Sequence, residues 1–124
     1  MPHHLENLPG EWLYYLAPES MSAVKIGKVS ALHMYAGRFK AMQAMNHERL
    51  WCLAISGPMW NRGERDRHRE FDVDRIHGEW FRPSRHLLIH ISGQRLQTPD
   101  HWLKGHGLGD WILPAEIVEE RLSR

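Results

Sequence analysis

The stretch that decides the fold runs from Trp12 to Val29 and reads WLYYLAPESMSAVKIGKV. Its first part, residues 12–16, is aromatic and apolar, which is typical of a strand. A proline interrupts it within residues 17–20, and residues 23–29 then alternate apolar and polar side chains as a half-buried strand does. The two segments are therefore predicted to pair as an antiparallel hairpin.

A helix and a core strand are expected after this hairpin. Ser30 is a plausible N-cap for the helix. The helix should bury one face, whose members are Leu32, Tyr35, Ala36, Phe39 and Met42. Residues 49–56 form an almost uninterrupted apolar run, which predicts a buried strand.

The second half of the chain predicts two more helices and a short extended segment. Pro58 is expected near the first turn of a helix over about 59–72. A loop around residues 74–78 and an extended segment at 79–81 should follow it. Pro83-Ser84 then opens a third helix, with Leu87, Leu88 and Ile91 on its apolar side.

The pattern weakens beyond Gly93. Glycines at positions 105, 107 and 109 indicate a flexible loop, and residues 115–122 fit a terminal helix. The order β-β-α-β-α-(β)-α predicts an α/β protein of the α+β type, with a small central antiparallel sheet of about three strands flanked by helices. We expect a lead-in at 1–10, a domain at 11–92, and a C-terminal extension at 93–124 that packs on that domain.

Composition fits one small domain with a real core. The 124 residues are 42% apolar, include six tryptophans and carry a net charge of +1. The single cysteine, Cys52, lies in the apolar run and cannot form an internal disulfide. Neither a secretory signal nor an apolar run of about 20 residues is visible, so a cytoplasmic location without membrane contact is expected. The ten histidines lack metal-ligand spacing.

Four short patterns carry the candidate chemistry. They are Tyr14 on the first strand, Lys25-Ile26-Gly27 on the second, Arg38 on the first helix, and Glu64 with His68 and Phe71 on the second helix. Each has an ordinary structural explanation when taken alone, such as strand packing, a solvent-facing lysine or a surface ion pair. Gly27 would allow close approach of a neighbour, and an arginine fork suits a phosphate.

Taken in order, these patterns resemble the GIY-YIG endonuclease superfamily. The chain is most similar to the phage and bacterial branch, whose second motif reads Lys-Ile-Gly and whose glutamate motif reads Glu-x-x-x-His-x-x-Phe. A segment like Glu79-Trp80-Phe81 follows in that branch, so the likeness covers residues 11–92. This chain lacks the glycine of the first motif and has Lys25 where the second tyrosine usually stands.

The resemblance implies hydrolysis of phosphodiester bonds in DNA, or in RNA as a second option, with one divalent ion, Mg²⁺ or Mn²⁺. Glu64 would hold the ion and Arg38 would clamp a phosphate oxygen. Tyr14 would take or relay a proton, helped by Lys25, which could instead neutralise the phosphate. His68 would orient Glu64 or carry a proton. The residues expected to contact nucleic acid are Lys28, Arg38, Lys40, Arg62 and Arg65, and those of the structural motif are Gly27, Phe71, Glu79, Trp80 and Phe81.

Two other functions remain open at the level of sequence. A non-catalytic module of the same fold would bind nucleic acid through the same basic residues, and its affinity would fall steeply with salt. A protein-interaction domain would use tryptophans such as Trp102 and Trp111 as anchors. Because residues 94–124 are short for a targeting domain, we expect weak intrinsic specificity, a homodimer, or a targeting partner that supplies specificity.

Overall fold

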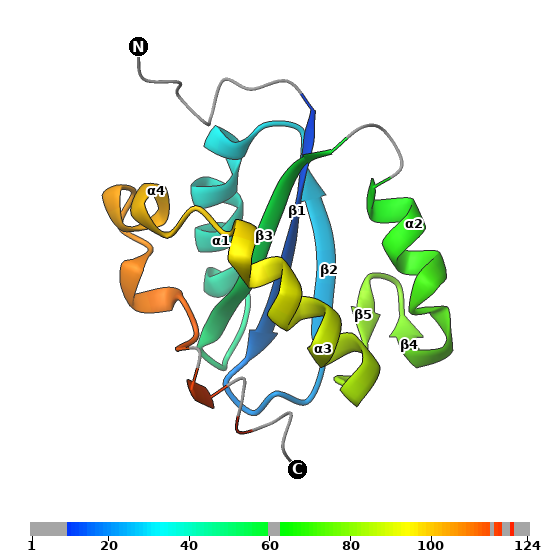
Figure 1. Cartoon of the computed structure of the whole chain (residues 1–124). Coiled ribbons are helices and arrows are strands. Elements are labelled where there is room, and N and C mark those ends of the chain that lie inside the picture. Colours follow the sequence, from blue (N-terminus) through cyan, green and yellow to red (C-terminus); the bar gives the residue numbers. More distant parts are fainter. Residues whose placement is uncertain (1–9, 60–62, 115, 118–119, 121–124) are drawn as a thin grey trace.

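An antiparallel sheet organises the part of the chain that the computed structural model describes, which is residues 10–59, 63–114, 116–117 and 120. The sheet contains five strands in the order β3-β1-β2-β5-β4 (Figure 1). Their bounds are Glu11–Pro18 for β1, Val24–Val29 for β2, Leu50–Met59 for β3, Arg75–His77 for β4 and Trp80–Phe81 for β5. The α+β class is confirmed, but the expected count of about three strands is wrong because two short strands extend the sheet.

The predicted hairpin is formed by β1 and β2. Tyr14 lies opposite Gly27 and Leu16 lies opposite Lys25 in its antiparallel register. The next pair in the sheet is β1 with β3, which is also antiparallel. Strand β1 is therefore enclosed on both sides, and all its residues from Trp12 to Ala17 are buried.

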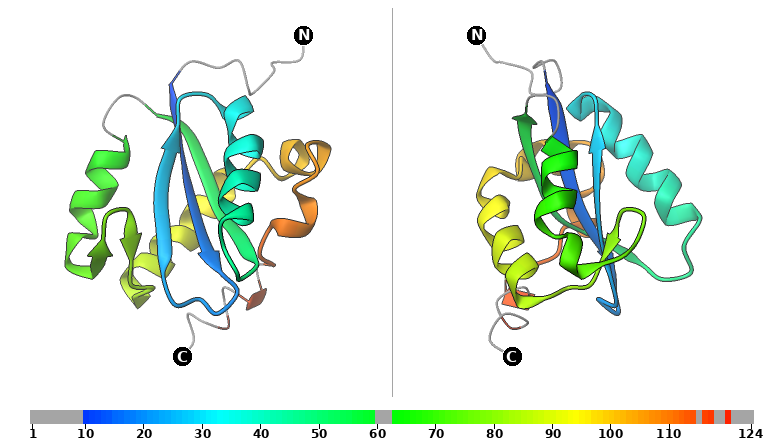
Figure 2. Two further views of the ribbon diagram at one scale, coloured as in Figure 1. Left: turned by 180° about the vertical axis from the view of Figure 1, so that it is seen from behind. Right: turned by 90° about the vertical axis from the view of Figure 1, so that its right-hand side faces the viewer.

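Helices cover both faces of this sheet (Figure 2). Trp12, Tyr14 and Leu16 belong to one core cluster, which packs against α1 (Tyr35–Ala44) and α4 (Asp100–Gly105). Side chains in between, such as Leu13 and Tyr15, belong to a second cluster with residues of α3 (Arg85–Gln94). This alternation follows from the period of two along a strand.

The first helix begins later than its sequence suggests. A short 3-10 helix, η2 (Leu32–Met34), precedes α1. The N-cap residue is Ala31 for η2 and Met34 for α1, and neither makes a side-chain capping hydrogen bond. The prediction of Ser30 as N-cap is therefore wrong. The buried face is confirmed, since the buried members are Leu32, Tyr35, Phe39 and Met42.

Pro58 does not open a helix. It lies inside β3, which continues to Met59 because that residue pairs with Glu11 on β1. Helix α2 spans Gly63–Glu70, and the 3-10 helix η3 (Asp72–Asp74) leads to β4, where a loop was expected. The third helix is confirmed: Ser84 caps α3 by accepting a hydrogen bond from the Leu87 N–H at 3.2 Å.

The C-terminal segment lies along the outer edge of β3. It comprises η4 (Arg95–Gln97), α4 and η5 (Gly109–Trp111). Thr98 Oγ1 accepts from Ile55 N at 2.9 Å and donates to Ile55 O at 3.2 Å. Arg95 Nη1 donates to Leu53 O at 2.6 Å. These hydrogen bonds satisfy backbone N–H and C=O groups on the outer edge of β3, where the described sheet has no further strand.

Two predictions fall partly or wholly outside the described residues. They are the lead-in at 1–10, of which only Gly10 is described, and the terminal helix at 115–122, of which only residues 116, 117 and 120 are described. The described helices include none that is long and apolar enough to cross a membrane.

Candidate functional site

A polar pocket of about 220 Å³ opens at the end of β2. Its walls come from four separate parts of the chain, namely β2, α1, α2 and the turn before β5. The lining residues are Lys28, Val29, Ser30, Arg38, Glu64 and Glu79. Three predicted site residues, Lys28, Arg38 and Glu64, are thus brought together although up to 36 positions separate them.

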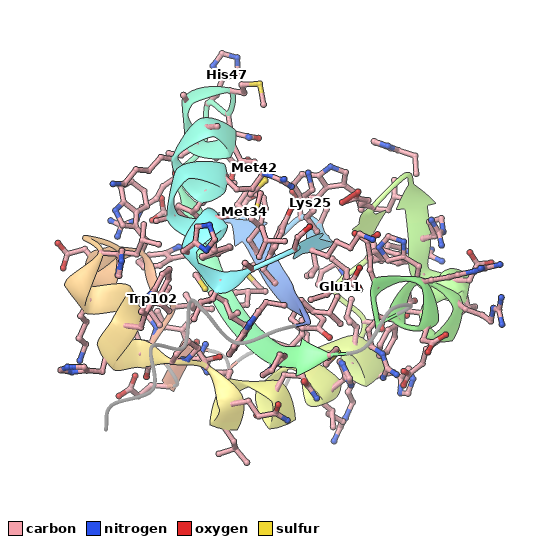
Figure 3. All side chains as sticks on the ribbon, turned by 90° about the horizontal axis from the view of Figure 1, so that it is seen from above. Glu11, Lys25, Met34, Met42, His47 and Trp102 are labelled. Atoms are coloured by element: carbon pink, nitrogen blue, oxygen red, sulfur yellow. The ribbon has the colours of Figure 1, made fainter. Side chains whose placement is uncertain are left out.

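The pocket exists because β5 is too short to cover β2. Strand β5 pairs only with Val24 and Lys25, so the rest of that edge of β2 is left without a strand partner in the described sheet. Helix α1 lies on one side of the uncovered edge and α2 on the other (Figure 1). In the view from above, Lys25 and Glu11 lie in the region between these two helices (Figure 3).

Tyr14 is not among the residues that line the pocket. Its side chain is 1% exposed, and its ring contacts Gly27 so closely that a Cβ there would lie 2.3 Å from both Cζ and Oη of the tyrosine. Burial raises the pKa of the Tyr14 hydroxyl above its ordinary value, whereas Arg38 opposes the rise through hydrogen bonding and its charge. Tyr14 is therefore held in its neutral form next to Arg38.

Lys25 occupies a different position from the one its expected role requires. Its partner across the hairpin is Leu16, not Tyr14, and its Nζ lies 5.9 Å from the centre of the Trp80 ring. The cation that lowers the pKa of Tyr14 is Arg38. Its Nη1 also donates to Lys28 O at 3.4 Å. The expectation that Lys25 assists Tyr14 receives no support from this geometry.

Two carboxylates share the pocket. Burial raises the pKa of the Glu64 carboxyl, and the negative charge of Glu79 raises it further, while His68 and Lys28 lower it. Lys28 is itself paired with Glu11, at 3.0 Å between Nζ and Oε2, and this contact raises the lysine pKa. Glu79 was expected only as part of a structural motif, so the pocket has one carboxylate more than the sequence suggested.

This donor set fits one hard divalent cation. Within residues 10–59, 63–114, 116–117 and 120, no group of three or more His, Cys, Asp or Glu side chains is arranged to hold a metal. Mg²⁺ needs fewer protein ligands than that, because it binds through one or two carboxylates and keeps several waters. Either Glu64 or Glu79 could supply such an oxygen, and a cation beside Glu64 would offset the negative charge of Glu79 that raises the pKa of Glu64.

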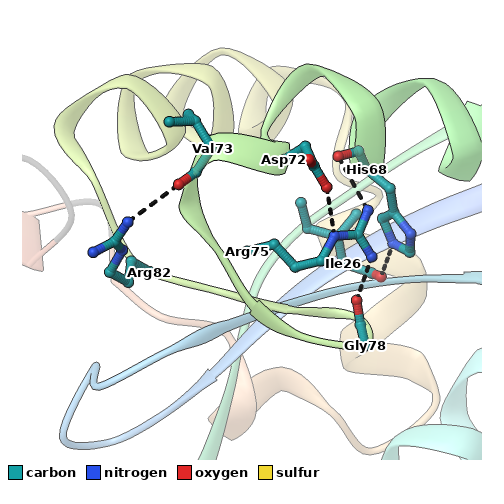
Figure 4. Close-up of polar contacts among 7 residues, drawn as sticks. All are labelled: Ile26, His68, Asp72, Val73, Arg75, Gly78 and Arg82. Carbon is teal, nitrogen blue, oxygen red and sulfur yellow. Dashed lines mark hydrogen bonds and ion pairs between the residues drawn. The ribbon is translucent and has the colours of Figure 1, made fainter.

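His68 ties α2 to β2 (Figure 4). Its Nε2 lies 2.8 Å from Ile26 O, and because that oxygen only accepts, Nε2 carries the proton and donates. The imidazole also packs against the Phe81 ring at 5.2 Å between centres. One turn of helix separates His68 from Glu64, so this contact fixes the glutamate relative to the β2 edge. Of its two expected roles, the geometry suits orientation better than proton transfer.

Arg75 completes a closed set of hydrogen bonds that we name the α2 clamp, made of Ile26, His68, Arg75, Gly78 and Glu79. Arg75 donates to His68 O at 3.3 Å and to Gly78 O at 2.6 Å (Figure 4). Ile26 N donates to Glu79 O at 3.0 Å. The helix that carries Glu64 and the turn that carries Glu79 are therefore joined to the same residue of β2.

The remaining predicted residues are distributed as follows. Lys40 and Arg65 are exposed, on α1 and α2, and Arg62 lies outside the described residues. Phe71 and Phe81 are buried in the core, and Trp80 is half-buried on β5. Trp102 and Trp111 pack into the α1-side core, where Trp111 also contacts Phe39 and Arg49. Trp102 is buried there, and Trp111 stays half-exposed.

Comparison with known proteins adds no relative to this picture. No protein-family model, no curated protein and no solved structure matches the chain. The site must therefore be interpreted from its own geometry.

Proposed function

We propose that this protein is a metal-dependent endonuclease that hydrolyses phosphodiester bonds of DNA. The observation that supports the proposal best is the pocket at the end of β2, where Lys28 and Arg38 lie together with Glu64 and Glu79. Lysine and arginine side chains bind phosphate. Of a pair of carboxylates, one can bind a divalent metal and the other can accept a proton. The GIY-YIG resemblance points to the same reaction.

Arg38 and Lys28 would bind the phosphate. Arg38 is exposed on α1 and its guanidinium can donate two parallel hydrogen bonds to non-bridging oxygens. Lys28 is also exposed, so that its ammonium can turn from Glu11 towards an entering phosphate. Glu64 would hold the metal with its carboxylate, and a bound divalent ion would supply Lewis acidity and offset charge at the phosphate.

The proton of the attacking water would pass to Glu79. The water oxygen forms a bond to phosphorus, the bond to the leaving sugar oxygen breaks, and that oxygen takes a proton from solvent. Tyr14 is poorly suited to accept the first proton, because it is buried and its pKa is raised. We assign it instead to positioning Arg38, and Lys25 to packing on Trp80.

A cleavage assay with matched variants tests the proposal. Purified protein is incubated with plasmid, single-stranded DNA and RNA, each with Mg²⁺, with Mn²⁺ or with a chelator. Glu64→Gln should abolish cleavage, and Glu79→Gln should lower it by about a hundredfold or more, as expected for loss of a general base. Glu19→Gln, at an exposed turn position, is the control and should cleave normally. Absence of metal-dependent cleavage by the wild-type protein would contradict the proposal.

One observation favours the non-catalytic alternative. Tyr14 is buried and Lys25 packs on Trp80, so neither tyrosine position of the family pattern presents a group to the pocket. A binding module would retain salt-sensitive affinity for nucleic acid and show no cleavage in any arm of the assay. The same preparation therefore separates the two functions.

A further inference from the structure

A second and larger pocket lies against α2. Its volume is about 570 Å³, and its lining residues are Glu64, Arg65, His68, Arg69, Asp72 and Arg75. We name it the α2 groove. Glu64 belongs to the lining of both this groove and the smaller pocket at the end of β2, so a phosphate bound in the α2 groove would lie beside the glutamate assigned to the metal.

The arginines of the α2 groove differ in whether their side chains already have hydrogen-bond or ion-pair partners. The Arg75 guanidinium is engaged by Asp72 at 2.8 Å and by the carbonyl oxygens of His68 and Gly78. Arg65 and Arg69 are both exposed, and neither makes a hydrogen bond or ion pair with another described residue. They are four positions apart on α2, which places their Cβ atoms about 5–6 Å from each other on one face.

We propose that the α2 groove holds the phosphodiester backbone of the nucleic-acid strand beside the bond that is cut, with Arg65 and Arg69 contacting neighbouring phosphates. This inference rests on the proposed function for the position of the cleaved phosphate. Phosphates of one strand rise by about 3.4 Å along a duplex, so one helical turn of protein spans one or two of them. Lys40 on α1, which was also expected to contact nucleic acid, lines neither pocket.

Salt-dependent binding of oligonucleotides tests this path. Affinity is measured by fluorescence anisotropy in chelator, where no cleavage interferes, for single-stranded and duplex DNA of one sequence at several salt concentrations. The variants are Arg65→Gln, Arg69→Gln and the double variant. Lys104→Gln on α4 is the matched control, because it removes one exposed positive charge on a helix far from α2 (Figure 1).

The expected result is a weaker affinity for each arginine variant. The slope of log affinity against log salt should shrink by about 0.9 per arginine on duplex DNA and about 0.7 on a single strand, and these losses should add in the double variant. Lys104→Gln should keep the wild-type slope. The inference is overturned if the double variant binds like the control, or if polyglutamate competes as well as DNA.

These outcomes are separate from those of the cleavage assay. A wild-type protein that does not cleave, but whose salt slope depends on Arg65 and Arg69, would refute the nuclease and support the α2 groove as a nucleic-acid surface. A protein that cleaves, but whose binding ignores both arginines, would support the nuclease and refute the groove.

Discussion

Replacing Gly27 by alanine should disturb the fold and the site together. The added Cβ would lie 2.3 Å from Cζ and Oη of Tyr14 and 2.8 Å from Cε1, where ordinary contact begins at 3.4 Å. The ring cannot retreat freely, because it packs against Tyr35 at 5.4 Å between centres and its hydroxyl points to Met42 Sδ at 3.8 Å. Overpacking of this kind costs about 1–3 kcal/mol.

The chain offers a matched substitution with the opposite sign. Gly37 lies in α1, and a Cβ there would meet nothing within 4 Å. Gly37→Ala should therefore raise the free energy of unfolding by about 0.5–1 kcal/mol through helix propensity alone. No packing contact therefore requires a glycine at position 37.

Urea unfolding followed by tryptophan fluorescence measures both variants. The expected difference between Gly37→Ala and Gly27→Ala is about 1.5–4 kcal/mol, which for a domain of this size is a gap of about 6–15 °C in Tm. Gly27→Ala should also reduce cleavage under conditions in which it is folded, because Tyr14 and with it Arg38 must shift. Equal stability of the two variants would refute the close approach of Tyr14 to Gly27.

Three further predictions concern other parts of the molecule. His68→Ala should speed amide hydrogen exchange across α2 and raise the Mg²⁺ concentration needed for cleavage. His68→Gln can still donate a hydrogen bond to Ile26 O, so its exchange rates and its Mg²⁺ requirement should lie closer to those of the wild-type protein. Unchanged exchange rates across α2 in the alanine variant would contradict the α2 clamp. Burial lowers the pKa of His90, which lies 2.9 Å from the Tyr15 hydroxyl, while Glu70 opposes the shift and Arg67 and His86 add to it. The unfolded chain therefore binds more protons at this site, and the free energy of unfolding should fall as pH drops through about 6.5. His90→Gln should make the free energy of unfolding, measured by urea titration, depend less on pH. The same pH dependence in the variant and the wild-type protein would contradict this role of His90. Burial raises the pKa of the Cys52 thiol to about 12, so iodoacetamide at pH 8 should modify the protein only in denaturant, and rapid labelling of the native chain would show that the residue is accessible.

Local pattern was sufficient for the central part of the fold. The aromatic and apolar run at 12–16 and the period of two at 23–29 identified the β1–β2 hairpin, and the apolar spacing from Leu32 to Met42 identified the buried face of α1. Tertiary pairing decided the elements that were misplaced. Pro58 stays in β3 because Met59 pairs with Glu11, and Arg75–His77 is a strand only because it pairs with β5. Glu11 is far from Pro58 in the sequence, and β5, although close to β4, is itself held in the sheet by the distant β2.

The residues of the candidate site were also predicted only in part. Lys28, Arg38 and Glu64 were expected at the site because of the resemblance to the GIY-YIG pattern, and the structure brings them to one pocket. Glu79 could not be selected as a pocket residue, because its place depends on the α2 clamp and on the turn at Gly78, where φ is +55°. The burial of Tyr14 was equally hidden, since strand alternation gives the face of a side chain but not its depth.

The covering of β3 by the C-terminal segment bears on how the protein behaves in concentrated solution. An exposed edge strand with free N–H and C=O groups is a template on which other chains can aggregate. Here Thr98 and Arg95 occupy the groups of Ile55 and Leu53, and Leu113 N donates to Cys52 O at 3.0 Å. Residues 95–113 therefore cover the edge of β3, the longest strand among the described residues, and should hinder intermolecular β-sheet growth there.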